Sequence, residues 1–138
     1  KQVLIISISE MISLPKRPIR EYMSTPLLTL RSDATLRDAI KLFIENHIHG
    51  APIMADDVMQ GILTLTDVAA AMANGYALDA PVTDVMTKDV VGAPAATKLF
   101  EVMKRFKERE IGRLIVLEDG KPIGILTQTD IIRILTPL

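Results

Sequence analysis

The heptapeptide Gly61-Ile-Leu-Thr-Leu-Thr-Asp67 returns with one change as Gly124-Ile-Leu-Thr-Gln-Thr-Asp130, 63 residues further along the chain. The same offset, without a gap, aligns further residues from about residue 18 to the C-terminus: Met23 with Met86, Leu36 with Leu99, Phe43 with Phe106 and Asp56 with Asp119. A constant offset over this length is typical of an internal structural repeat. The sequence therefore predicts two copies of one folding unit.

The composition excludes several classes of protein. A chain of 138 residues suits one globular domain, or two small halves that fold around a shared core. The absence of cysteine excludes disulfides, cysteine-ligated zinc, iron–sulfur clusters and thiol catalysis. A net charge of −1 and an aromatic content of 4% argue against a nucleic-acid partner. No uncharged stretch approaches the roughly 18–20 apolar residues of a membrane span. The hydrophobic content of 49% therefore predicts a large core, a self-association surface, or both.

Each copy contains two helical patterns. Apolar residues recur at helical spacing over residues 36–44, and the stripe returns over 99–106. Thr35 with Asp38, or Asp33 just before it, supplies an N-cap signal for the first of these helices. A second, shorter and more apolar helix follows the repeated heptapeptide, at 68–72 in one copy and 131–135 in the other.

A hairpin is predicted between the two helices of each copy. In the first copy, the apolar runs 51–54 and 60–63 flank the polar turn Asp56-Asp57. In the second copy, the runs 114–117 and 122–126 flank Asp119-Gly120, which is a strong hairpin dipeptide. A short extended stretch precedes the first helix of each copy, at 27–30 and 90–91.

The repeat also predicts the domain organisation: a first copy at 18–76, a second at 77–138, and residues 1–17 outside the repeat. One copy of about 55 residues would expose a sheet face and be marginal alone. We therefore expect two copies packed sheet to sheet about a pseudo-twofold axis, linked near Ala80-Pro81. At the N-terminus, Leu4, Ile5 and Ile8 fit a helix turn as well as alternation fits a strand. The first residue is not Met, which suggests that the chain begins inside a longer gene product or has been processed.

The doubled motif carries a family resemblance. Gly-Ile-Leu-Thr-x-Thr-Asp, each time after an apolar hairpin, resembles the CBS domain, which is named after cystathionine β-synthase. The stretches Met23-Ser-Thr-Pro and Met86-Thr-Lys-Asp fit the family as well. The resemblance covers about residues 18 to 136, and two copies in tandem resemble a CBS pair, or Bateman module.

This resemblance implies an α+β fold with one βαββα unit per repeat. It also implies that an adenosyl ligand, such as AMP, ADP, ATP or S-adenosylmethionine, binds in clefts between the repeats. Pairs of this family commonly regulate an attached enzyme, channel or transporter, and they associate into dimers.

The chemistry of the motif suits such a ligand. A carboxylate accepts two hydrogen bonds at once, which matches the adjacent 2′ and 3′ hydroxyls of a ribose. Asp67 and Asp130 lie where a strand gives way to a helix, and a helix N-terminus offers free N–H groups and a partial positive charge to a phosphate. Thr-x-x-Asp at a helix start is also a capping-box pattern, so the acid can serve the helix alone, the ligand alone, or both.

The resemblance assigns residues to two clefts, each built from the Thr-x-Thr-Asp corner of one repeat and from the entry segment and the apolar hairpin strand of the other. The favoured cleft one comprises Ser24, Thr29, Ile48, His49, Gly50, Pro52, Arg113, Thr127, Thr129 and Asp130. Cleft two comprises Thr64, Thr66, Asp67, Thr87, Gly92, Ile111, Gly112 and Ile115.

Four further residues carry alternative interpretations. Arg113 is a phosphate-binding cation in cleft one or a solvated charge, and cleft two has Gly50 at the equivalent position and only Lys88 nearby. His49 is interpreted as a donor that lines cleft one, and no metal site is expected because further ligands are not evident near His47. Gly61 and Gly124 are expected to allow close backbone approach rather than ligand contact.

These patterns favour a regulatory module that binds AMP or ADP, with ATP or S-adenosylmethionine as other ligands. A structural or protein-interaction module without a ligand is the alternative. The sequence has no phosphate loop, dinucleotide fingerprint or nucleophile with a base, so neither catalysis nor a catalytic cofactor is expected. We expect a cytoplasmic homodimer that associates through the apolar helices at 68–72 and 131–135 and acts on a partner protein that the sequence does not identify.

Overall fold

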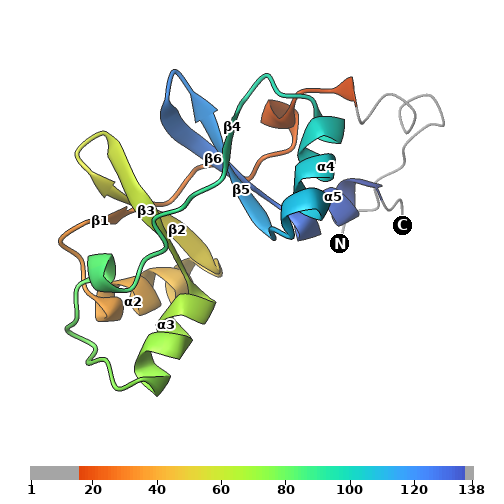
Figure 1. Ribbon diagram of the computed structural model, residues 1–138. Helices are drawn as coiled ribbons and strands as arrows, with labels where there is room; N and C mark the ends of the chain where they lie inside the picture. Colours follow the sequence, from red (N-terminus) through yellow and green to blue (C-terminus); the bar gives the residue numbers. More distant parts are fainter. Residues whose placement is uncertain (1–15, 136–138) are drawn as a thin grey trace. The chain divides into compact units, whose positions relative to one another are not determined.

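The computed structural model describes residues 16–135, which form two compact units. The first, called here the 28–90 unit, is one continuous stretch of chain. The second, called here the 91–135 unit, also includes residues 16–27. Each unit contains one three-stranded sheet, and Figure 1 shows helices beside the sheet of each unit.

The 28–90 unit has the βαββα order that the repeat predicts. Its elements are β1 (Leu30–Arg31), α2 (Leu36–Asn46), β2 (Gly50–Ala55), β3 (Val58–Thr64), α3 (Leu65–Ala73) and the short 3-10 helix η3 (Val82–Asp84). The strand order is β1-β2-β3, in which β1 runs parallel and β3 antiparallel to β2. The hairpin turn begins at Asp56, whose φ of 53° lies in the left-handed region that Asp tolerates better than most residues.

The 91–135 unit repeats this arrangement. Its elements are η2 (Ile19–Glu21), β4 (Gly92–Pro94), α4 (Leu99–Arg109), β5 (Arg113–Glu118), β6 (Lys121–Thr127) and α5 (Gln128–Leu135). The strand order is β4-β5-β6, with β4 parallel and β6 antiparallel to β5. The predicted α+β class with two βαββα repeats is therefore confirmed. The first strand of each unit starts slightly later than expected, because the residues that pair with the middle strand are 30–31 and 92–94.

Each unit has its own hydrophobic core between its helices and its sheet. In the 28–90 unit, α2 buries Leu36, Ala39 and Phe43, which recur at the spacing of one helix face. In the 91–135 unit, Leu99 and Phe106 of α4 occupy the equivalent positions. Burial on this scale stabilises by about 1.5–3 kcal/mol for each large apolar side chain. This burial holds α4 in place although the N-cap residue of α4, Lys98, makes no capping hydrogen bond through its side chain.

A short segment leads into each repeat, and we call residues 18–26 and 81–89 the leading segments. Residues 18–26 precede the first repeat but pack on the sheet of the second, and residues 81–89 precede the second repeat but pack on the sheet of the first. The Ile19 N–H donates to the Thr97 carbonyl at 2.8 Å, and the Ser24 N–H donates to the Ile125 carbonyl at 2.9 Å. In the 28–90 unit, Thr87 and Ile62 exchange two backbone hydrogen bonds of 2.9 Å. The fold therefore brings Met23–Ser24 beside β6, and Met86–Thr87 beside β3.

Two glycines make this close approach feasible. A Cβ atom at Gly61 would lie 2.6 Å from the Thr87 carbonyl oxygen, and one at Gly124 would lie 2.5 Å from Met23 Sδ. Real Cβ contacts are essentially never that short, so a side chain at Gly61 would push the backbone of Thr87 away from the sheet, and one at Gly124 would displace the Met23 side chain. The expected role of Gly61 and Gly124 in close backbone approach is confirmed.

The expected link near Ala80-Pro81 is part of the 28–90 unit. The Leu36 N–H donates to the Ala80 carbonyl and the Arg37 N–H to the Leu78 carbonyl, both at 3.0 Å. The first N–H groups of a helix lack partners within the helix, and these carbonyls supply them for α2. The Ala80-Pro81 signal gave no indication that this segment would dock on the start of α2.

Candidate ligand-binding corners

Each unit has one strand-to-helix corner that carries the repeated motif. In the 28–90 unit, the Asp67 N–H donates to Thr64 Oγ1 at 3.1 Å, and the Thr64 N–H donates to Asp67 Oδ2 at 3.0 Å. Thr127 and Asp130 make the same reciprocal pair at 3.1 and 3.0 Å. Both corners are capping boxes, as one of the two sequence interpretations requires.

The start of α2 shows that a capping box alone does not indicate a ligand site. Thr35 and Asp38 form a third box at the start of α2, with bonds of 2.9 and 3.3 Å, although no repeated motif precedes them. What separates the two candidate corners from this helix start is their position, because each follows directly on the last strand of its sheet.

Several polar groups at both corners stay open. The first helical N–H groups are taken, because Leu65 donates to the His49 carbonyl at 2.8 Å and Gln128 to the Gly112 carbonyl at 3.1 Å. The next N–H groups and hydroxyls, those of Thr66 and Thr129, have no hydrogen-bond partner among residues 16–135. The same holds for the second carboxylate oxygen, Oδ1, of each aspartate. Fewer free N–H groups remain than the sequence suggested, but each corner keeps one N–H, one hydroxyl and one carboxylate oxygen for a ligand.

The two corners differ in charge. Arg113 stands directly opposite Thr127 in the β5–β6 ladder, and Gly50 occupies the equivalent place opposite Thr64. The Arg113 side chain is half-buried, and no ion pair to it occurs in the described part of the chain. The 91–135 corner therefore carries an arginine beside Thr127, whereas the 28–90 corner has a glycine at that place.

The predicted cleft residues fall into both units. Of cleft one, the 91–135 unit holds Ser24, Arg113, Thr127, Thr129 and Asp130, and the 28–90 unit holds Thr29, Ile48, His49, Gly50 and Pro52. Of cleft two, the 28–90 unit holds Thr64, Thr66, Asp67 and Thr87, and the 91–135 unit holds Gly92, Ile111, Gly112 and Ile115. Each unit thus assembles one complete corner with its leading segment, and the grouping of residues from two units into one cleft stays a prediction.

Two of the predicted residues offer a ligand little through their side chains. Pro52 and Ile115 are fully buried, although neither belongs to the core between the helices and the sheet. Ile115 alternates with Leu114 and Val116, which do belong to that core, so it lies on the opposite face of the sheet. His49 is exposed, and its backbone carbonyl already serves the start of α3.

The structure also reveals residues that the sequence did not indicate. Asp67 lines a cavity of about 230 Å³ together with Tyr76, Asp84 and Val85, from the segments that follow α3. These residues follow no motif of their own, so only the folded chain shows that they share a cavity with Asp67. The repeat offers one signal, because the offset of 63 aligns Glu21 with Asp84, so both leading segments carry an acid at the same position.

Two features are absent from residues 16–135. No three His, Asp or Glu side chains there lie close enough together to hold a metal ion. None of the helices there has the length and apolar character needed to cross a bilayer.

A comparison with known families settles the classification. The family model of the CBS domain matches residues 19–74 and again 82–137, which together make up most of the chain. The chain belongs to the CBS domain family. The two matches correspond to the two βαββα repeats, so the chain contains a CBS domain pair.

Relatives of this CBS domain pair include longer proteins. The chain is 31% identical over 136 residues to the uncharacterized protein MJ1232 of Methanocaldococcus jannaschii, covering 98% of this chain and 45% of that protein. It is 31% identical over 119 residues to MJ1225 of the same organism, covering 86% of this chain and 42% of that protein. The chain thus spans less than half the length of these two relatives.

Solved structures of CBS domains share the fold. A conserved protein from Pyrococcus horikoshii is 29% identical, with a TM-score of 0.80 over 87% of this chain and 92% of that chain. The CBS domain pair of protein MJ0100, solved in complex with 5′-methylthioadenosine and S-adenosyl-L-methionine, is 26% identical. Its TM-score is 0.79 over 87% of this chain and 96% of that chain.

Proposed function

We propose that this CBS domain pair is a regulatory module that binds an adenine nucleotide, with AMP or ADP favoured, at the corner formed by Thr127, Thr129 and Asp130. The observation that carries the proposal is Arg113, which stands opposite Thr127 at the same corner. Asp130 Oδ1 would accept from a ribose hydroxyl, and the Thr129 N–H and hydroxyl would reach the phosphate. The Arg113 guanidinium would add the positive charge that a phosphate prefers.

The 28–90 corner suits an adenosyl ligand without a phosphate. It has the same open groups on Thr66 and Asp67, but Gly50 replaces the arginine, and Asp84 lies on the cavity next to Asp67. Two carboxylates and no guanidinium disfavour an anion there. The relative that binds 5′-methylthioadenosine and S-adenosyl-L-methionine supports ligands of this kind, and S-adenosylmethionine or ATP stays the alternative ligand.

Regulation would follow from the ligand's preference for one conformation. A ligand shifts a conformational equilibrium only by the difference between its affinities for the two states. Binding at 100 times the dissociation constant would stabilise the liganded state by about 2.7 kcal/mol. The target would be an attached or separate partner protein, in the cytoplasm where adenine nucleotides are used. The module itself would bind its ligand without catalysing a reaction.

A structural module without a ligand is the second candidate. Its support is that one carboxylate oxygen of Asp67 and of Asp130 is already used by the backbone of its own helix start. In that case the two acids would serve only to begin α3 and α5.

Self-association is part of the proposal in either case. Ile44 of α2 is 68% exposed, and Leu65 and Met72 of α3 are 45% and 46% exposed, which is unusual for large apolar side chains on neighbouring helices. A second copy of the chain would bury this face and also the apolar surface of α5, where Ile132 is 62% exposed. Met72→Glu is then expected to shift the sedimentation coefficient toward that of a single chain, and an unchanged value would exclude this face as the contact.

Calorimetry of matched variants tests the ligand site. Asp130→Asn keeps an oxygen for the Thr127 N–H but places an amide donor where the ribose hydroxyls would donate. It should weaken AMP binding by about 1–3 kcal/mol, roughly tenfold or more, with little change in stability. Asp38→Asn is the control, because it makes the same change in a capping box that has no ligand role. Equal AMP affinity in both variants would refute the ribose contact.

Arg113→Ala tests the phosphate contact separately. It should weaken AMP and ADP binding and leave 5′-methylthioadenosine binding unchanged, because only the nucleotides carry a phosphate. If none of AMP, ADP, ATP, S-adenosylmethionine or 5′-methylthioadenosine produces heat on titration into the wild-type chain, the structural candidate replaces the sensor.

A further inference from the structure

Two methionine side chains of this CBS domain pair occupy equivalent positions in the two units. Of the seven methionines, Met11 alone lies outside residues 16–135, and among the others only Met23 and Met86 align under the offset of 63. Each directly precedes a residue that hydrogen-bonds the leading segment to a strand, Ser24 on β6 and Thr87 on β3. The chain contains no cysteine, so methionine is its only oxidisable sulfur.

The sulfur atom of each methionine lies against a glycine of the repeated heptapeptide. A Cβ atom at Gly124 would lie 2.5 Å from Met23 Sδ. One at Gly61 would lie 2.9 Å from Met86 Sδ, whereas ordinary contact begins at 3.4 Å. No further atom therefore fits between either sulfur and its glycine. Both side chains also pack on the hydrophobic core of their own unit, so they help to hold the leading segment on the sheet.

An oxygen atom on either sulfur is incompatible with this packing. Oxidation converts a flexible apolar thioether into a polar sulfoxide. An oxygen directed at the sheet would meet the glycine, and one directed into the core would lose its hydrogen bonds to water. The sulfoxide is accommodated only when the side chain turns outward into water, and that movement removes the contacts that hold the leading segment.

We propose that Met23 and Met86 are paired oxidation sites at which peroxide loosens the two leading segments. Both residues are only partly buried, so a molecule as small as hydrogen peroxide can reach them. The sulfur attacks one peroxide oxygen, the O–O bond breaks and water leaves. The thioether is thereby oxidised to the sulfoxide, and the peroxide is reduced. A methionine sulfoxide reductase restores the thioether, with a thiol reductant that is oxidised to a disulfide.

The loosened segments include residues of the predicted clefts, Ser24 and Thr87. Oxidation is therefore expected to weaken ligand binding as well, a consequence that rests on the proposed function. The loosening itself depends only on contacts within each unit. It can be measured without a ligand, so the absence of a nucleotide site would leave that result unchanged.

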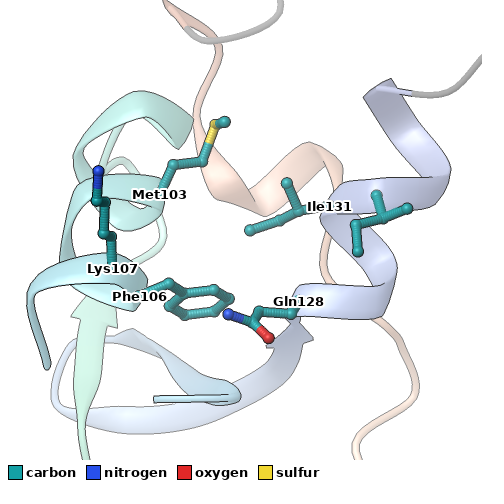
Figure 2. Close-up of a pocket in the computed structure, with 6 residues that line it drawn as sticks. Met103, Phe106, Lys107, Gln128 and Ile131 are labelled. Atoms are coloured by element: carbon teal, nitrogen blue, oxygen red, sulfur yellow. The ribbon is translucent and has the colours of Figure 1, made fainter. Parts of the chain in front are cut away.

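Each unit offers a control methionine whose sulfoxide has room. Met103 of α4 borders an open cavity of about 380 Å³ in the 91–135 unit. Figure 2 shows its side chain on the α4 side of this cavity, with Ile131 of α5 on the other. In the 28–90 unit, Met72 of α3 is 46% exposed. We expect oxidation of Met103 or Met72 to leave the leading segments unchanged.

Amide hydrogen exchange after graded treatment with hydrogen peroxide tests the proposal on the full chain. Peptide mass spectrometry assigns the sulfoxide to each methionine. Sulfoxide at Met86 should speed exchange of the Thr87 amide at least about tenfold, and sulfoxide at Met23 should do the same at Ser24, because each amide then loses its strand partner.

Leucine variants separate the individual sulfur atoms, because leucine nearly conserves the volume of methionine and does not oxidise. Met86→Leu should abolish the peroxide response at Thr87 and keep the response at Ser24, and Met23→Leu should do the reverse. Met72→Leu and Met103→Leu should keep both responses. Methionine sulfoxide reductases A and B with dithiothreitol should return both exchange rates to their starting values.

Three results would overturn the proposal. The first is unchanged exchange at Ser24 and Thr87 when Met23 and Met86 are oxidised. The second is a response that persists in the Met23→Leu and Met86→Leu variants. The third is exchange that stays fast after mass spectrometry shows that the sulfoxides have been reduced.

Discussion

Replacing Gly61 with alanine should detach the leading segment 81–89 from β3 within the 28–90 unit. The new Cβ would lie 2.6 Å from the Thr87 carbonyl oxygen and 2.9 Å from Met86 Sδ, whereas ordinary contact begins at 3.4 Å. The methionine side chain can turn aside, but the carbonyl belongs to the backbone and must move by about 0.8 Å. That shift stretches the two 2.9 Å hydrogen bonds between Ile62 and Thr87 beyond their normal range.

The magnitude follows from three contributions. Overpacking of this kind costs about 1–3 kcal/mol. Each weakened hydrogen bond costs up to about 1 kcal/mol. Alanine gains back about 0.5–1 kcal/mol over glycine in a strand because the unfolded chain loses less freedom. We expect Gly61→Ala to lower the free energy of unfolding by about 2 kcal/mol.

Urea unfolding followed by circular dichroism measures the free energy, and amide hydrogen exchange at Thr87 reports the detachment itself. Gly112→Ala is the control, because a Cβ atom added there would meet no other atom within 4 Å and the φ of Gly112 is not in the left-handed region. Its stability should change by less than about 0.5 kcal/mol. Equal stability of Gly61→Ala and the wild type, with unchanged exchange at Thr87, would refute the steric argument.

Three further predictions concern the 91–135 unit. Lys98→Thr should stabilise by about 0.5–1 kcal/mol, measured by urea unfolding, because threonine would complete a capping box with Glu101. Gly124→Ala should destabilise less than Gly61→Ala, because the nearest atoms belong to the flexible Met23 side chain, and in the Met23→Ala background the added methyl should cost less still, because Met23 Sδ and Cγ are gone. Burial raises the pKa of Tyr22, so the folded chain holds the phenol proton more tightly than the unfolded chain does. Stability should therefore fall as pH rises above about 10, and Tyr22→Phe should remove that loss in thermal unfolding scans.

The sequence predicted the local structure well where a local pattern determines it. Thr35 with Asp38 caps α2 as expected, and the hairpins turn at Asp56 and Asp119. These features depend on residues a few positions apart, so their signals are contained in short windows of sequence. The constant offset of 63 extended each assignment from one repeat to the other.

The sequence could not predict how the leading segments or the link would dock. The contact of Ser24 with Ile125 joins residues about 100 positions apart, and nothing local to either residue encodes it. Tyr76 and Asp84 lie closer to Asp67 in sequence, but they follow no motif, so they were missed beside it. Only the folding of the stretch that follows α3 creates that cavity.

The sequence also could not choose between capping and ligand binding for Asp67 and Asp130, because a carboxylate has two oxygens that can serve two purposes. The structure assigns Oδ2 to the helix start and leaves Oδ1 open within the described residues. The two interpretations are therefore compatible, and it takes a ligand titration to separate them.

Amide chemical shifts test the central claim most directly. With ¹⁵N-labelled chain and increasing AMP, saturable shifts should appear first at Thr129 and Asp130 and at Arg113, while the capped start of α2 at Asp38 stays unchanged. Shifts that never saturate, or that are as large at Asp38 as at Asp130, would contradict a nucleotide site at the strand-to-helix corner.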